Sequence, residues 1–162
     1  MTQQDLIEEL HTIPWLLDLT PQQFAKLAGM TSMKLLEQDE ILFTEGERED
    51  SLYILLDGRI ELEMYVPTLG HLVLSVAEAL DVLGWSSMTP VVRQRVASGR
   101  ALMPCRLLRL NAIDLQQLCD EDPEMGYIIM RRLANAVASC LLTMRVQLFN
   151  TIMRSAQEEI QE

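Results

Sequence analysis

The sequence has few of the residues that metal and redox sites require. It contains two histidines, His11 and His71, whereas a mononuclear metal centre in a small β-barrel needs several histidines and a carboxylate from neighbouring strands. Its three cysteines, Cys105, Cys119 and Cys140, are odd in number and widely spaced, which indicates buried thiols in a reducing compartment rather than a disulfide framework or an iron–sulfur site. The motifs of serine hydrolases, P-loop proteins and dinucleotide-binding enzymes are missing. We therefore expect no metal and no enzymatic activity.

Basic residues and long apolar runs are also scarce. Thirteen Lys and Arg against 24 Asp and Glu give a formal net charge of -11, and a field of that sign repels nucleic acid and anionic lipid. Residues 1–16 are acidic and lack the basic and apolar regions of a secretory signal. The longest uncharged run of the late helix, 133–144, is shorter than the roughly 20 apolar residues that cross a bilayer. These features predict a soluble, cytoplasmic protein without nucleic-acid or membrane partners.

The length and periodicity predict one structural domain with three parts. A chain of 162 residues with 49% hydrophobic content can bury one substantial core. We expect N-terminal helices over 1–30, a β barrel over 31–111, C-terminal helices over 112–155 and an acidic tail over 156–162.

The middle part reads as short antiparallel strands. Ile60, Leu62 and Met64 alternate with polar residues, as in a strand with one buried face. Asp57-Gly58 is a hairpin signal between strands at 51–56 and 59–66. Further strands are expected at 71–78, 95–102 and 105–110. No helical crossover separates these strands, so the fold class is mainly β, an antiparallel barrel or jelly roll with flanking helices.

Capping signals delimit the helices. Thr20 followed by Pro21 opens a helix that runs to residue 28, after a first helix over 3–11. Asn111 caps a short helix over 112–119, and Asp122 followed by Pro123 opens a long helix toward residue 155.

This order of elements is found in cyclic-nucleotide-binding domains, and specific residues carry the resemblance. Gly46, Tyr53 and Gly58 occur where the family has them, within the segment FTEGEREDSLYILLDGRIEL. Gly84 opens a segment that resembles the phosphate-binding cassette, and RVASGRA, residues 95–101, resembles the strand start that carries the phosphate-binding arginine. The resemblance covers about 13–150. It implies a double-stranded β-helix jelly roll and a regulatory sensor role, as in bacterial transcription regulators of the catabolite activator type.

The resemblance also implies a ligand site, from which two polar residues have been lost. In the family a glutamate beside the cassette glycine accepts from the ribose 2'-hydroxyl, and a small hydroxyl residue follows the arginine. Here Trp85 and Val96 occupy those positions. An unpaired buried hydroxyl costs about 1 to 3 kcal/mol, or roughly ten- to a hundredfold in affinity. The implied ligand is a cyclic nucleotide or another small anion, and the implied ligand-binding residues are Gly84, Trp85, Ser86, Ser87, Arg95 and Val96.

Each of these residues also has a simpler interpretation. Arg95 could be a surface arginine, with Arg93 as a substitute ligand, and Ser86 and Ser87 could only cap the cassette helix. Trp85 could fill the pocket or stack on a planar ligand. In the alternative function, the pocket is filled by Trp85 and the protein is an interaction subunit that binds no small molecule.

His71 has two interpretations of its own. It follows Gly70 at the start of an expected strand, where an exposed or edge histidine is the simpler assignment. Haem ligation, as in gas sensors of the same superfamily, is the alternative.

The long helix carries a heptad pattern that predicts a parallel homodimer. Two apolar rows run side by side, so that one can pack on the barrel and the other on a twin helix. The alternative is a helix wholly buried on its own barrel. The predicted dimer seam contains Met130, Ala134, Val137, Leu141, Met144 and Leu148, and the second row contains Ile129, Leu133, Ala136 and Cys140.

The end of the chain bears on the output of the predicted sensor. Only twelve residues of the 162 follow position 150, so we expect no DNA-binding domain. The signal would then pass to a separate effector protein.

Overall fold

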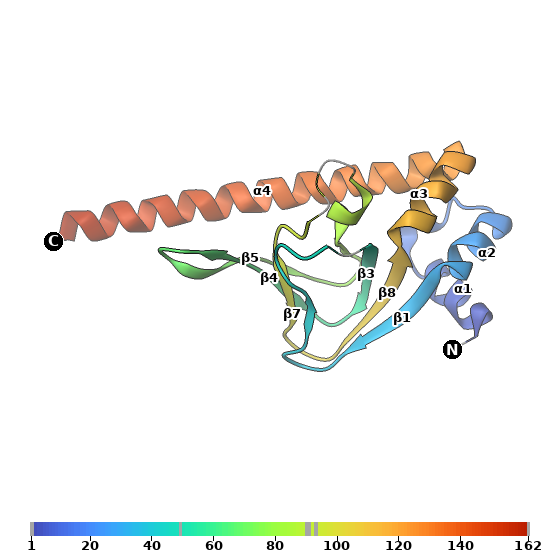
Figure 1. The fold of residues 1–162 in the computed structure, drawn as a ribbon, viewed down its shortest axis with the longest axis horizontal. Helices are drawn as coiled ribbons and strands as arrows, with labels where there is room; N and C mark the ends of the chain where they lie inside the picture. The colour runs from blue at the N-terminus through green and yellow to red at the C-terminus, as the bar shows by residue number, and fades with distance from the viewer. Residues whose placement is uncertain (1, 49, 90–91, 93, 162) are drawn as a thin grey trace.

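Two four-stranded antiparallel sheets form the body of the computed structural model, which describes residues 2–48, 50–89, 92 and 94–161 (Figure 1). The sheet orders are β1-β8-β3-β6 and β2-β7-β4-β5. This arrangement confirms the predicted jelly roll. The strands are β1 (Thr31–Leu36), β2 (Ile41–Phe43), β3 (Ser51–Asp57), β4 (Ile60–Val66), β5 (Gly70–Ala77), β6 (Val82–Leu83), β7 (Ser98–Ala101) and β8 (Cys105–Asn111).

The shorter helices gather at one end of this body, and the longest helix runs from that end across the body and beyond it (Figure 1). Side-chain caps hold the predicted helix starts, because the Thr20 hydroxyl accepts from the Gln23 amide and Asn111 Oδ1 accepts from two amides of the next turn. The helices are α1 (Gln3–His11), α2 (Pro21–Gly29), α3 (Ala112–Glu121) and α4 (Pro123–Gln161), with 3-10 turns η1 (Pro14–Leu16) and η2 (Trp85–Met88).

One cap joins distant parts of the chain. Asp122 Oδ1 accepts from the Met125 amide at 3.1 Å, and Asp122 Oδ2 accepts from Gln23 Nε2 on α2 at 2.8 Å. The bond from Gln23, followed by the bond from Met125, holds the pKa of Asp122 below its ordinary value. The start of α4 is therefore tied to the N-terminal helices.

The apolar residues form two cores on either side of one sheet. Tyr53 and Leu55 of β3 lie in the barrel interior, whereas Leu52 and Ile54 pack in the core beneath the helices. Because both faces of β3 are buried, the strand reads as a continuous apolar run instead of alternating.

Helix α4 belongs to the core only near its start. Met125, Ile129 and Leu133 are buried, the middle of the helix crosses the barrel, and its later turns extend past the barrel beside the β4–β5 hairpin (Figure 1). The helix continues to Gln161, beyond the end that we expected near residue 155. No proline follows Pro123, so no residue in this segment breaks the backbone hydrogen-bond pattern.

The composition of α4 also meets a simple criterion for a membrane span. Within Pro123–Arg154, an 18-residue window reaches a mean hydropathy of 1.3. The length of the uncharged run alone did not reveal this window, because a membrane span can contain one or two charged residues. Length and composition alone are weak support for a span, and the beginning of the same helix is part of the protein core.

Gly58→Ala is expected to destabilise the fold. Gly58 has a φ of +98°, and an added Cβ would lie 2.5 Å from Cys105 Sγ and 2.7 Å from the Pro104 carbonyl oxygen. We expect the free energy of unfolding to fall by about 1 to 3 kcal/mol in urea denaturation. The matched control is Gly29→Ala in α2, where no atom lies within 4 Å of the added Cβ. It should raise stability by about 0.5 to 1 kcal/mol. Equal effects would contradict this account of the hairpin.

Candidate functional site

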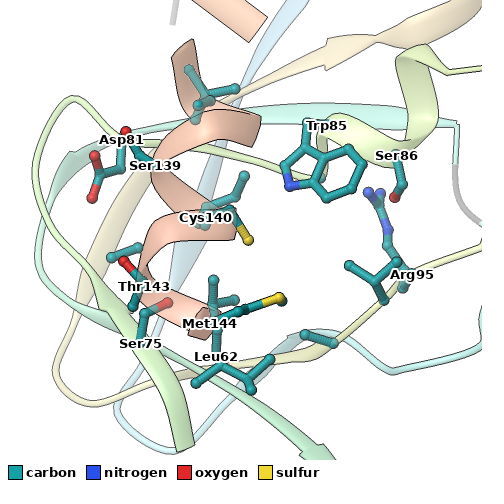
Figure 2. Close-up of a pocket in the computed structure, with 18 of the residues that line it drawn as sticks. Leu62, Ser75, Asp81, Trp85, Ser86, Arg95, Ser139, Cys140, Thr143 and Met144 are labelled. Atoms are coloured by element: carbon teal, nitrogen blue, oxygen red, sulfur yellow. The ribbon is translucent and has the colours of Figure 1, made fainter. Parts of the chain in front are cut away.

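A cavity of about 220 Å³ lies between the barrel, the turn η2 and the middle of α4 (Figure 2). The barrel wall includes Leu62, Leu74 and Ser75 from β4 and β5. The cavity therefore joins segments that are far apart in the sequence. The wall from α4 consists of Arg132, Asn135, Ala136, Ser139, Cys140, Thr143 and Met144.

Gly84 opens the turn that forms one wall. Its φ of +73° is left-handed, a conformation that glycine adopts without strain. The Ser87 amide and hydroxyl both donate to the Gly84 carbonyl oxygen, at 3.0 and 2.8 Å. Ser87 thus closes the turn locally and does not line the cavity, whereas Gly84 and the buried Ser86 do line it.

Arg95 is a buried residue of the barrel. Only 3% of it is exposed, and its Nη2 donates to the Ser51 carbonyl oxygen at 2.8 Å. The guanidinium carbon lies 4.8 Å from the ring centre of Phe43 and 5.9 Å from that of Tyr53. The interpretation of Arg95 as a surface arginine is therefore wrong. The Phe43 and Tyr53 rings allow Arg95 to be buried, because the face of an aromatic ring attracts a cation.

The strand that we predicted from residue 95 begins later, at Ser98. The Arg95 amide donates to the Glu47 carbonyl oxygen at 3.0 Å, and the Arg95 carbonyl oxygen accepts from the Gly46 amide at 2.9 Å. These bonds lead to the turn around Gly46 and not to the neighbouring strands, so Arg95 lies outside β7. Arg93, which we considered as a substitute ligand, lies outside the described residues.

Trp85 and Val96 both line the cavity. The half-buried Trp85 ring projects toward α4, and its indole nitrogen points toward Cys140 (Figure 2). Burial raises the pKa of the Cys140 thiol, and the nearby Trp85 indole offsets only part of that rise, so the thiol is protonated at neutral pH. Cys140 is a neutral wall residue with no thiolate character.

A polar row on α4 was not predicted from the sequence. Asn135, Ser139 and Thr143 recur every four residues and line the cavity; Asn135 and Ser139 are exposed, and Thr143 is half-buried. Their spacing was the available signal. Met144, which we assigned to the dimer seam, is half-buried and also lines the cavity.

Arg132 connects α4 to the loop between β5 and β6. Its Nη2 donates to the Leu80 carbonyl oxygen at 3.0 Å, and its guanidinium lies over the Trp15 ring at 5.5 Å. Leu80 has a left-handed φ of +75°, which is strained for a leucine. The Leu80 amide donates to the Leu55 carbonyl oxygen at 2.7 Å. Hydrogen bonds at both the amide and the carbonyl of Leu80 therefore hold the strained residue in place.

Most of the predicted dimer seam is exposed in the single chain. Met130, Leu141 and Leu148 are 49%, 68% and 62% exposed. Ala134 is also exposed, and Val137 is half-buried. The alternative of a helix wholly buried on its own barrel is therefore wrong.

His71 lies on the β4–β5 hairpin and outside the cavity wall. It is exposed, with its ring tilted against Tyr65 and its Nδ1 3.6 Å from Glu63. Within the part of the chain that the structure describes, no three His, Cys, Asp or Glu residues gather into a metal-binding group.

Comparison with known proteins supports the fold and the family. The family model for the cyclic nucleotide-binding domain matches residues 33–122. No curated protein matches the chain.

Several solved structures are similar. A cyclic nucleotide-binding domain from Methylobacillus flagellatus has 21% identity and a TM-score of 0.75, and the match covers 92% of this chain and 83% of that one. The N-terminal domain of a transcriptional regulator from Streptomyces coelicolor has 28% identity and a TM-score of 0.65, covering 84% and 94%. The catabolite activator protein of Thermus thermophilus has 20% identity and a TM-score of 0.66, covering 84% and 63%.

The family match spans more than half of the chain, and the two-sheet jelly roll with its cassette turn agrees with it. The chain therefore belongs to the cyclic nucleotide-binding domain family.

Proposed function

We propose that this protein is a regulatory sensor module in which a small ligand binds in the cavity at the diverged cassette and changes the position of α4. The observation that carries this proposal is the composition of the cavity wall, because the cassette turn and α4 both contribute to it. A ligand that contacts both walls favours one spacing between them and shifts the helix accordingly.

The contacts between these walls support the coupling. The Trp85 indole of the cassette turn lies beside Cys140 of α4 (Figure 2), and Arg132 of α4 donates to the Leu80 carbonyl oxygen in the loop between β5 and β6. A ligand that moves Trp85 must therefore disturb a contact with α4. The signal would pass from α4 to a separate effector protein, in a soluble and cytoplasmic setting.

The rival function is an interaction subunit whose pocket is filled by Trp85. A cavity of about 220 Å³ remains beside the Trp85 ring, which favours a site that can still accept a ligand. This observation is the reason for preferring the sensor.

We further propose that α4 forms a parallel homodimer. Met130, Leu141 and Leu148 occupy a and d positions of the heptad pattern and expose apolar surface that a second copy of the same helix could cover. A membrane is the competing cover for this surface, given the hydropathy of the helix.

Restoring the two lost polar residues should create cyclic AMP binding. The double variant Trp85→Glu/Val96→Ser places an acceptor for the ribose hydroxyl and a hydroxyl for the phosphate in the cavity wall. We expect isothermal titration to give at least a tenfold higher affinity for cyclic AMP than the unmodified protein. Trp85→Leu/Val96→Ala is the matched control, because it opens similar space without the polar groups. A folded double variant that produces no heat would count against a ligand site at the cassette.

A charge placed in the predicted dimer seam tests the dimer. Light scattering should give twice 18.5 kDa for the unmodified protein and about 18.5 kDa for Leu141→Glu, because the substitution buries a carboxylate in the seam. Gln147→Glu adds the same charge at an exposed polar position of α4 and should remain dimeric. An unmodified protein of 18.5 kDa that sediments with phosphatidylcholine vesicles would favour the membrane instead.

A further inference from the structure

We infer that the cavity selects a planar, uncharged ring compound that carries hydroxyl or carbonyl groups, and not a cyclic nucleotide or another anion. This inference rests on the proposed function, because it concerns the same cavity. Three features of the wall support it: the engaged arginines, the aromatic and aliphatic surface, and the polar row on α4.

Each of the two arginines in the wall makes contacts within the protein. Arg95 is almost fully buried, donates to the Ser51 carbonyl oxygen and stacks against Phe43 and Tyr53. The Arg132 guanidinium is directed to the Leu80 carbonyl oxygen and lies over Trp15. A phosphate that bound either group would have to compete with these contacts and lose its own hydration.

The remaining charges disfavour an anion further. Asp81 is one of the residues that line the cavity; its exposed carboxylate accepts from the Glu78 amide at 2.9 Å and lies on the side of α4 away from Trp85 (Figure 2). The chain as a whole carries a formal net charge of -11. Both the local and the overall field therefore repel a negatively charged ligand.

The centre of the cavity suits an apolar ring. The Trp85 ring lies on one side of the open space, and Leu62 and Met144 lie on another (Figure 2). Val96 adds aliphatic surface at the position where the family has a hydroxyl. An indole face stacks on planar molecules, and methionine adapts to their edges, so these walls match a flat ring better than a ribose phosphate.

The polar row supplies groups that could orient such a ring. Asn135, Ser139 and Thr143 line the α4 wall, and Ser75 lines the barrel wall. None of these four side chains hydrogen-bonds to another residue in the part of the chain that the structure describes. A few polar groups in a mostly apolar wall are typical of small-molecule sites, and these four are uncharged.

The test compares two probes with the same ring, 2-naphthol and 2-naphthyl phosphate, by isothermal titration. We expect 2-naphthol to bind and the phosphate to bind at least tenfold more weakly, because only the phosphate brings a charge that must be desolvated in a mostly apolar cavity. Ala136→Phe should abolish 2-naphthol binding by filling the cavity. Ala138→Phe places the same ring at an exposed position on α4 outside the cavity wall and should leave binding unchanged. The melting temperature of each variant shows that it is folded.

Thr143→Val tests the polar row without changing the cavity's shape. We expect it to weaken 2-naphthol binding two- to tenfold, because it removes a hydrogen bond to the ligand hydroxyl. Unchanged affinity in this variant would overturn the role assigned to Thr143.

Three results would overturn the inferred ligand class, and they separate it from the proposed function. Tighter binding of 2-naphthyl phosphate would identify an anion site and leave the sensor proposal intact. Binding of neither probe, together with cyclic AMP binding by Trp85→Glu/Val96→Ser, would reject the ring ligand but retain the site. Binding of neither probe and no gain of cyclic AMP binding would reject both proposals.

Discussion

The buried guanidinium of Arg95 is the interaction on which the arrangement of the site depends. It joins the Ser51 carbonyl oxygen of β3, the Phe43 ring of β2 and the Gly84 backbone, against which the guanidinium packs. A side chain at Gly84 would collide with this group, so the left-handed glycine and the arginine require each other. A buried charge that loses its partners costs about 3 to 5 kcal/mol. The cassette turn is therefore held to the barrel by the protein's own contacts, whether or not a ligand is bound.

Helix α4 has a different environment along each part of its length. Its first turns carry Met125 and Leu133 into the core, its middle turns present Ser139 and Thr143 to the cavity, and its later turns expose Leu148 to solvent. A rigid helix transmits a displacement at one point to the others. Since the hydrogen bonds at Asp122 anchor the start of the helix to α2, a change at the cavity would swing the later turns about a fixed end.

Much of the fold could be predicted from the sequence, but less of the site. The Asp57-Gly58 hairpin and the caps at Thr20 and Asn111 were found because each depends on residues within a few positions of one another. The burial of Arg95 was not predictable in this way, because its partners lie about 40 to 50 residues earlier in the chain. The cavity face of Met144 was also missed, since a heptad pattern gives the spacing of a row but not the surface that covers it.

The sequence by itself determined the order of helices and strands, the turn at Gly84 and the loss of polar groups at Trp85 and Val96, because these are properties of residue type and local spacing. Only the tertiary structure decided that Trp85 meets Cys140, that both arginines are engaged within the protein and that a cavity remains between barrel and helix. The physical reason is that packing and charge neutralisation act between segments brought together by folding, and sequence distance does not limit them.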